Sequence, residues 1–402
     1  MKYAVVLMDG AADRPLPGLG NKTPLQYARK QAIDWLARKS MLGMVQTIPQ
    51  GMAPGSDTAN LSVMGYDPAK YHTGRSPLEA VSMGIILQDK DVAFRCNLVT
   101  LAGGKSYREK TMVDHSAGEI TTPESRDLIN YAGSKLGTES IKFYPGVSYR
   151  HLMVWQEGPG YFELTPPHDI LGQAVTNYLP QGNMAHKLLD MMERSTHFLE
   201  GHPVNLKRAE KGLRQANSIW IWGHGKRPKL DSFRQKYGVS GSVISAVDLI
   251  KGIGICAGLE PVEVEGATGT LNTNFTGKGQ AAIAELKRND FVYIHIEAPD
   301  ECGHQGDAAG KIKAIEEIDH KIIGPLLDFF NNSGHDFKIM VLADHPTPIS
   351  VRTHTPDPVP FLIYNNREKL SCPEAAFDEF WPEINGLKVD PGHRLLDIFF
   401  GK

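Results

Sequence analysis

Short apolar runs that each end in polar residues constrain the fold of this chain more than any other feature. The first run, YAVVLM, ends at Asp9, as buried parallel strands often do. Later runs of the same kind are SIWIWGHG, GSVISAV, DFVYIHIEAPD and FKIMVLADHP, and helical stretches such as GQAAIAELKR separate several of them. Strands that alternate with helices predict an α/β fold whose largely parallel sheet is flanked by helices. Such sheets bind their ligands at the carboxyl ends of the strands.

Residues 91–190 depart from this pattern. Their stretches VAFRCNLVTL, YREKTMVDH and SIKFYPGVSYRHLMVWQ are strand-like, and one helix is expected near ESRDLINYAGSKLG. The chain length of 402 residues also exceeds the roughly 100–200 residues of a single domain. We therefore predict an inserted, smaller α+β domain at residues 91–190 and a core made of residues 1–90 and 191–402.

Composition excludes several functional classes. The net charge of −3, from 43 basic and 46 acidic residues, gives no general attraction to nucleic acid or to an anionic membrane. No segment approaches the ~20 apolar residues of a membrane span, and the first apolar run is too short for a secretory signal. The four cysteines form no CxxC pair, which favours a reducing compartment. We expect a cytoplasmic protein that binds neither nucleic acid nor membrane, and the sequence is compatible with a homo-oligomer.

A serine lies in a tight turn within APGSDTAN, residues 53–60. Pro54 and Gly55 impose a bend, and a helix is expected to begin directly afterwards with Ser56 or Asp57 as its N-cap. Capping is the ordinary role of such a serine. The alternative is a nucleophile, because a helix N-terminus favours the anions on which such a group would act.

Five polar clusters at predicted strand ends and turns contain residue types that bind metals. Asp300 and His304 are four residues apart in APDECGH, so a helix would place them on one face. Carboxylates combined with imidazoles suit Mn²⁺ or Zn²⁺. Each cluster alone is a weak signal, but five clusters at the carboxyl ends of strands in one sheet predict a shared site. Its candidate residues are Asp9, Ser56, Asp300, His304, Asp344, His345 and His354.

These motifs, in this order, carry a resemblance to a known family. The stretches MDGAADRP, PGSDTANLSVMGYDP, YHTGRSPLEA, APDECGHQGD and ADHPTP with THTPDPVP resemble the archaeal-type cofactor-independent phosphoglycerate mutases. That family belongs to the alkaline phosphatase-like superfamily of two-metal enzymes. The resemblance extends over nearly the whole chain and implies a metal-bearing α/β core with an inserted substrate-binding domain.

The resemblance also implies roles for individual residues. One metal ion would be held by Asp300, His304 and His354, and the other by Asp9, Ser56, Asp344 and His345. Mn²⁺ is the expected ion, with Mg²⁺, Zn²⁺ and Co²⁺ as alternatives. Ser56 is then the nucleophile, and the phosphoryl group of 3-phosphoglycerate, a small phosphorylated substrate, would pass through it to the 2-hydroxyl. The insert would close over the site and exclude water from the phosphoserine.

The insert supplies candidate substrate residues. Resemblance to larger bacterial enzymes of the superfamily implies an acid–histidine pair, together with arginines that hold carboxylate and phosphate. Asp114 is the candidate acid/base, His115 is its neighbour, and Arg150 is either a substrate ligand or a solvated strand end. Lys226 and Lys251 follow predicted core strands and are further candidates for phosphate binding, although surface lysines are common.

Other activities remain open on the same residues. One related subgroup has been proposed to phosphorylate homoserine, and a metal-dependent phosphatase would differ only in admitting water to the phosphoserine. A catalytically silent metal-binding protein is disfavoured, because both the ligand set and the nucleophile are complete. The stretch GATGTLNTNFTGKG is not a nucleotide-binding P-loop, because Gly279 follows Lys278 where serine or threonine is required.

Overall fold

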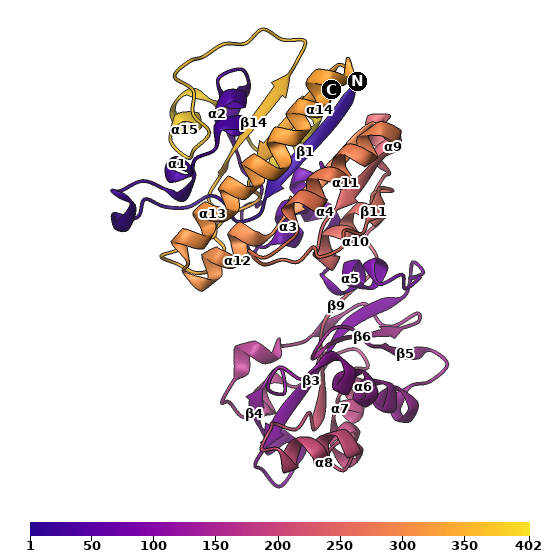
Figure 1. The fold of residues 1–402 in the computed structure, drawn as a ribbon. Helices are drawn as coiled ribbons and strands as arrows, with labels where there is room; N and C mark the ends of the chain where they lie inside the picture. The colour runs from indigo at the N-terminus through magenta and orange to yellow at the C-terminus, as the bar shows by residue number, and fades with distance from the viewer. The chain divides into compact units, whose positions relative to one another are not determined.

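Two compact units make up the chain, and the structure, a computed structural model, describes all 402 residues. The first, here called the core unit, consists of Met1–His72 and Lys229–Lys402. The second, here called the inserted unit, is the continuous stretch Thr73–Pro228. Each unit is described by itself (Figure 1).

An eight-stranded sheet in the order β11-β10-β12-β1-β13-β14-β2-β15 organises the core unit. Its central strands β12, β1 and β13 are apolar and buried because helices cover the sheet. The strands are β1 (Lys2–Met8), β2 (Met41–Val45), β10 (Gly241–Ile244), β11 (Glu260–Val262), β12 (Phe291–Ile296), β13 (Phe337–Leu342), β14 (Val359–Asn365) and β15 (Leu387–Val389).

The register of the central strands brings their carboxyl ends to one edge. β1 is parallel to both neighbours, with Met8 opposite Ile296 of β12 and Leu7 opposite Leu342 of β13. The residues that follow these three strands therefore lie next to one another at the carboxyl edge of the sheet. β14 is antiparallel to β13 and to β2, so the sheet is largely parallel, as predicted.

Helices flank this sheet, and Figure 1 shows α11, α13 and α14 lying along one face of it. A π-helical turn at Asp319–Ile323 joins α13 to α14. The core helices are α1 (Pro24–Tyr27), α2 (Gln31–Ala37), α3 (Ser56–Val63), α4 (Pro68–Tyr71), α9 (Phe233–Tyr237), α10 (Asp248–Cys256), α11 (Phe275–Arg288), α12 (Ala298–Gln305), α13 (Ala308–Ile318), α14 (Gly324–Ser333), α15 (Trp381–Asn385) and α16 (Leu395–Phe400). None of the helices combines the length and apolar character of a membrane span.

The inserted unit is an α+β structure around an antiparallel sheet, in which β4 and β6 pair with β3, β5 with β6, and β9 with β3. Its strands are β3 (Val92–Ala102), β4 (Thr111–Asp114), β5 (Ile141–Tyr144), β6 (Arg150–Trp155), β7 (Phe162–Glu163), β8 (Gln181–Gly182) and β9 (Ser218–Gly225). Its helices are α5 (Ser76–Ser82), α6 (Thr122–Leu136), α7 (Ala185–Leu199) and α8 (Pro203–Glu210).

The assignment of SIWIWGHG to the core sheet is wrong. This stretch forms β9, which pairs antiparallel with β3, with Ile221 opposite Cys96. Its apolar side chains belong to the hydrophobic core of the inserted unit. The inserted unit is accordingly wider than the predicted residues 91–190, because α5 packs on both β3 and β9, and α7 packs on β9.

Candidate metal centre

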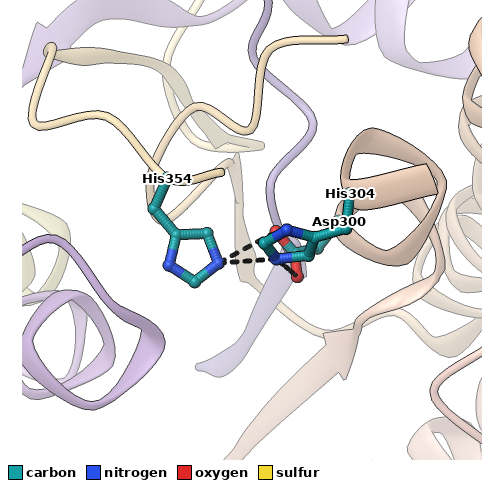
Figure 2. Close-up of side chains that lie close together, drawn as sticks. All are labelled: Asp300, His304 and His354. Atoms are coloured by element: carbon teal, nitrogen blue, oxygen red, sulfur yellow. Dashed lines mark hydrogen bonds and ion pairs between the residues drawn. The ribbon is translucent and has the colours of Figure 1, made fainter. Parts of the chain in front are cut away.

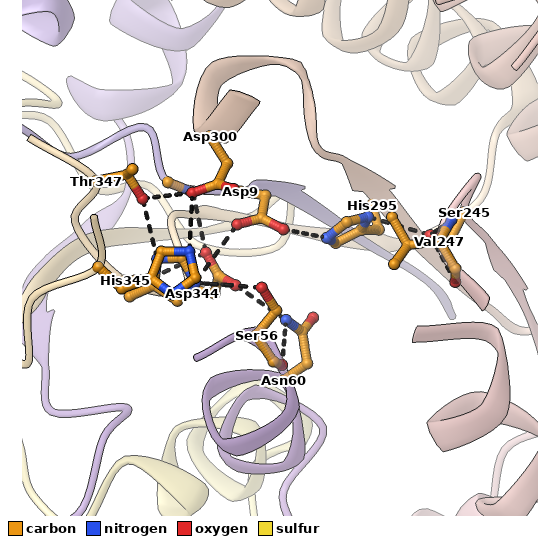
Figure 3. A network of polar contacts seen from close by, with 12 residues as sticks. Asp9, Ser56, Asn60, Ser245, Val247, His295, Asp300, Asp344, His345 and Thr347 are labelled. Carbon is orange, nitrogen blue, oxygen red and sulfur yellow. Dashed lines mark hydrogen bonds and ion pairs between the residues drawn. The ribbon is translucent and has the colours of Figure 1, made fainter. Parts of the chain in front are cut away.

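Three parallel strands deliver the acidic residues of the site to one edge of the core sheet. Asp9 follows β1, Asp300 lies on α12 just beyond β12, and Asp344 follows β13. All three are at least 95% buried, with exposures of 1%, 5% and 0%. Figure 3 shows them converging in one network of polar contacts. The prediction that the strand-end clusters share one place is confirmed.

The first predicted ligand group forms a compact trio (Figure 2). His304 Nε2 lies 3.2 Å from Asp300 Oδ2, and His354 Nε2 lies 3.4 Å from Asp300 Oδ1. The two Nε2 atoms are 3.0 Å apart. His304 Nδ1 lies 3.1 Å from the carbonyl oxygen of Arg352, which suits an Nδ1–H donor and makes Nε2 the candidate ligand atom.

The second predicted group surrounds His345. Its Nε2 lies 3.3 Å from Ser56 Oγ, 3.4 Å from Asp344 Oδ2 and 3.7 Å from Asp9 Oδ1. The donor atoms of Asp9, Asp300 and His345 also lie within 4.8 Å of one another. Asp300 therefore lies close to both groups.

Ser56 is the first residue of α3, but it does not cap that helix. The N-cap position belongs to Gly55, and no side chain accepts a capping hydrogen bond there. The expectation that Ser56 or Asp57 is the N-cap is wrong, because the helix begins one residue earlier than an N-cap serine requires. The Ser56 hydroxyl instead faces His345. Asn60, one turn later, donates to the Ser56 carbonyl at 2.9 Å and to Asp344 Oδ2 at 3.0 Å, which ties the helix to the acidic cluster.

A buried ion pair fixes the loops that carry these residues. Lys311 Nζ on α13 lies 2.7 Å from Asp13 Oδ2, and both side chains are 0% exposed. The same ammonium donates to the carbonyl oxygens of Ala12 and Thr347. It therefore joins the loop after β1 to the loop after β13. A buried charge that lost its partner would be costly, so the pair holds the two loops together.

The electrostatics of the cluster fit a divalent cation. Burial, together with the nearby Asp344 and Asp300, raises the pKa of Asp9 well above its ordinary value. Burial acts in the same direction on Asp300, but hydrogen bonds with His304 and His354 hold its pKa well below the ordinary value. The hydrogen bond to Asp300 raises the pKa of His304 to about 9. Asp9 Oδ1 is buried without a hydrogen-bond partner. Clustered carboxylates, a buried carboxylate oxygen without a hydrogen-bond partner, and nearby imidazoles form a donor set that suits a metal.

Three of the predicted substrate residues lie in the inserted unit: Asp114 ends β4, His115 follows it, and Arg150 begins β6 and is exposed. The placement of Lys226 after a core strand is wrong, because Lys226 follows β9 of the inserted unit. Lys251 lies in the core unit, but its Nζ is paired with Glu263 Oε1 at 2.8 Å and with Asp248 Oδ1 at 3.6 Å. This pairing does not support phosphate binding by Lys251.

Asp114 holds a turn together. Oδ1 accepts hydrogen bonds from the backbone N–H and the hydroxyl of Ser116, both at 2.8 Å. Oδ2 accepts from Gly118 N at 3.0 Å and pairs with Arg214. Burial opposes ionisation, but these hydrogen bonds outweigh it and lower the pKa of Asp114 to about 2. A carboxylate this acidic is a poor proton acceptor near neutral pH, so the contacts favour a structural role over acid/base chemistry.

Replacing Asp114 with asparagine is expected to lower the free energy of unfolding by about 2 kcal/mol at pH 7. Because the folded-state pKa of Asp114 is depressed to about 2, its contribution is present above the unfolded pKa and is lost as pH falls through about 4 to 2. Urea unfolding at pH 7 and at pH 3 measures the difference, which should shrink at the lower pH. The exposed Arg150, replaced with alanine, is the control and should unfold like the wild type. Equal stability of the Asp114 variant and the wild type at pH 7 would contradict this assignment.

Sequence reasoning missed three residues of the site. Thr347 donates to Asp300 Oδ1, Asn60 links α3 to Asp344, and His295 Nε2 lies 2.7 Å from Asp9 Oδ2. His295 is 0% exposed within the apolar strand β12. A histidine inside an otherwise apolar strand is the one signal that could have revealed it, because a buried polar group requires a partner.

Comparisons with known proteins identify the family that this chain resembles. A family model described as 2,3-bisphosphoglycerate-independent phosphoglycerate mutase matches residues 37–205. A Methanosarcina acetivorans protein of that name is 53% identical over 382 residues, which cover 94% of each chain. A Geobacter sulfurreducens protein, named a probable enzyme of the same kind, is 48% identical over 402 residues and 100% of both chains.

Solved structures share the fold over the whole chain. A protein from Pyrococcus horikoshii is 30% identical, with a TM-score of 0.83 over 100% of this chain and 96% of that one. A structure described as cofactor-independent phosphoglycerate mutase, from Thermoplasma acidophilum, is 25% identical. Its TM-score is 0.67 over 100% of this chain and 99% of its own. The predicted fold class is confirmed over the whole chain.

Proposed function

The chain belongs to the 2,3-bisphosphoglycerate-independent phosphoglycerate mutases, and from this premise we propose that it transfers a phosphoryl group through Ser56. The enzyme is an isomerase that interconverts 3-phosphoglycerate and 2-phosphoglycerate. One observation carries the proposed mechanism. The Ser56 hydroxyl, at the start of α3, lies 3.3 Å from His345 Nε2 within a buried cluster of carboxylates and imidazoles.

Two divalent ions are proposed for this cluster. One would be held by Asp300, His304 and His354, which already face one another. The other would be held by Asp9, Ser56, Asp344 and His345, with Asp9 Oδ1 as the oxygen still lacking a hydrogen-bond partner. When bound, such ions lower the pKa of a coordinated hydroxyl and neutralise charge on a transferring phosphoryl group. Mn²⁺ is the proposed ion, and Mg²⁺, Zn²⁺ and Co²⁺ share the same ligand chemistry.

Ser56 performs the covalent step. Its Oγ attacks phosphorus, and the new O–P bond forms as the bond to the 3-oxygen of the substrate breaks. The glycerate leaves with the electron pair of that bond, and its 3-oxygen takes up the equivalent of the proton that the Ser56 hydroxyl lost. After it turns, its 2-hydroxyl loses a proton as its oxygen attacks the phosphoserine, and the released Ser56 oxygen regains a proton, giving 2-phosphoglycerate. The start of α3 supports both steps, because the N-terminus of this eight-residue helix favours the anionic phosphoryl group.

Asn60 and Lys311 keep this arrangement in place. Asn60 fixes Asp344 relative to Ser56, and Tyr293 donates to Asn60 Oδ1 at 2.7 Å, so the amide has one orientation. Lys311 holds the two loops that supply Asp9 and Asp344. Neither residue needs to touch substrate for this role. Closure of the inserted unit, and substrate binding by His115, Arg150 and Lys226, stay predictions, as do a cytoplasmic location and a homo-oligomer.

The alternative activities are less well supported. The homoserine alternative is not favoured, because the relatives that match nearly the whole chain are named phosphoglycerate mutases. A phosphatase would use the same Ser56 and the same ligands, and would differ in allowing water to reach the phosphoserine. The assay below separates both from a mutase.

We expect the protein, loaded with excess Mn²⁺ and desalted, to retain two ions per chain and to convert 3-phosphoglycerate into 2-phosphoglycerate. Metal is counted by elemental analysis, and the product is detected by coupling to enolase. Chelation should abolish turnover without unfolding the chain, since a core of this size does not depend on metal to fold. Release of inorganic phosphate as the main product would indicate a phosphatase, and phosphorylation of homoserine with ATP would indicate the other alternative. One ion or none per chain would contradict the two-metal proposal.

A further inference from the structure

A fully buried chain of polar groups leads from Ser245 through His295 to Asp9 (Figure 3). His295 lies on β12, is 0% exposed, and places its Nε2 2.7 Å from Asp9 Oδ2. Its other ring nitrogen, Nδ1, lies 3.1 Å from the hydroxyl of Ser245, which follows β10. No step proposed above uses Ser245 or His295, although together they contact one of the most buried metal-ligand candidates.

The hydrogen bonds define which ring nitrogen carries the proton. The backbone N–H of Val247 donates to Ser245 Oγ at 3.0 Å, so the serine oxygen already accepts one bond. Its single hydroxyl proton has two acceptors: His295 Nδ1 at 3.1 Å and the Val247 carbonyl at 3.5 Å. The shorter contact is the better hydrogen bond. Nδ1 is then the acceptor, and the ring proton is on Nε2, from which it is donated to Asp9 Oδ2.

The consequence for Asp9 is an asymmetry between its two oxygens. Oδ2 is occupied by His295, whereas Oδ1 is buried without a hydrogen-bond partner and lies 3.7 Å from His345 Nε2. A carboxylate with one oxygen occupied by a fixed donor offers the other to a metal. Partners of this kind orient ligands and tune their affinity.

We propose that His295, with its tautomer set by Ser245, is a positioning residue that makes Asp9 a one-oxygen metal ligand through Oδ1. The inference rests on the metal binding proposed above. In this proposal His295, which lies on β12 and is not itself a ligand, orients the ligand Asp9. A purely structural role for the ring would affect stability but not the affinity for metal.

Binding of Mn²⁺ alone to the metal-free full chain, measured by isothermal titration calorimetry, tests this inference. His295→Phe keeps an aromatic ring but removes the donor, and should weaken the affected site by about 10–100-fold. His295→Gln keeps an amide N–H at a similar reach and should recover most of that loss. The matched control is His151→Phe. It replaces a histidine that is 2% exposed on β6 of the inserted unit, and should leave Mn²⁺ affinity unchanged.

The tautomer gives an independent readout. The ring ¹⁵N shifts of His295 in the wild type, measured metal-free and with diamagnetic Mg²⁺, should show a protonated Nε2 and an unprotonated Nδ1. Ser245→Ala should mix the two tautomers and weaken Mn²⁺ binding. This readout decides the question even if His295→Phe does not fold.

The outcomes distinguish a failure of the proposed metal binding from a failure of the positioning role alone. A wild type that binds no Mn²⁺ would refute the proposed metal chemistry itself. If the wild type binds Mn²⁺, the positioning role is overturned by a folded His295→Phe variant of equal affinity. It is also overturned by a glutamine variant as weak as the phenylalanine variant, or by a wild-type ring protonated on Nδ1.

Discussion

Replacing Ser56 with alanine is expected to lower mutase turnover by at least about 10⁴-fold, because the variant loses the oxygen that we propose carries the phosphoryl group. Water attacks slowly in its place and cannot return phosphate to the glycerate. Stability should change by no more than about 1 kcal/mol, since the side chain caps no helix and its one polar contact is with His345. The second metal ion should bind more weakly, because one of its oxygen ligands is gone.

Labelling gives the direct test. The wild type is incubated with labelled phosphoglycerate and quenched in acid, and the labelled peptide is mapped; the label should be on Ser56. The control is Ser62→Ala on the same helix, where the lost hydroxyl donates to the carbonyl of Thr47 and faces no ligand. That variant should keep its turnover. Label on another residue, or a Ser56→Ala variant with near-normal activity, would rule out the phosphoserine mechanism.

His304→Ala is expected to lower turnover by about 10³-fold, because several kcal/mol of charge stabilisation depend on a correctly held metal. Only Asp300 and His354 would remain at that position, and their Oδ1 and Nε2 atoms lie 3.4 Å apart in the wild type. The metal count should fall from two ions to one. The variant keeps the neighbouring group around His345 complete, so the remaining ion should stay bound.

Elemental analysis after desalting measures the number of ions per chain, and the coupled assay measures turnover. His320→Ala removes an exposed histidine from the turn between α13 and α14 and is the matched control. It should retain two ions and full turnover. A His304→Ala variant that keeps both ions, or that loses both, would show that the two ligand groups are not divided as proposed.

The sequence predicted the convergence of the core-site aspartates because these residues follow a local rule. Asp9, Asp300 and Asp344 each follow an apolar strand, and parallel strands deliver such residues to one edge without further information. The i, i+4 spacing of Asp300 and His304 needed only a helix, and α12 supplies it.

The parts that could not be predicted depend on pairing between distant segments. The apolar character of SIWIWGHG suits a buried strand in either sheet, so it could not predict which sheet contains it. Its hydrogen bonds to β3 place it in the inserted unit. The proposed role of His295 depends on Asp9, 286 residues away, and on Asp9 Oδ1, which has no hydrogen-bond partner. The state of Asp114 depends on Arg214 and on the turn at Ser116. No periodicity or spacing encodes contacts of this kind.

Because β1 lies between β12 and β13, the core sheet can form only late in synthesis on the ribosome. The inserted unit is one continuous segment, Thr73–Pro228, and has all of its own strands once that segment has emerged. β1 is synthesised first but gains its second neighbour only when Leu342 has been added. Domains generally fold as units as they leave the ribosome, so the inserted unit can fold while β1 still lacks its neighbour β13. A nascent chain stopped before β13 would carry Asp9 and Ser56 without Asp344 and His345, and would have a folded inserted unit attached to an unfinished catalytic core.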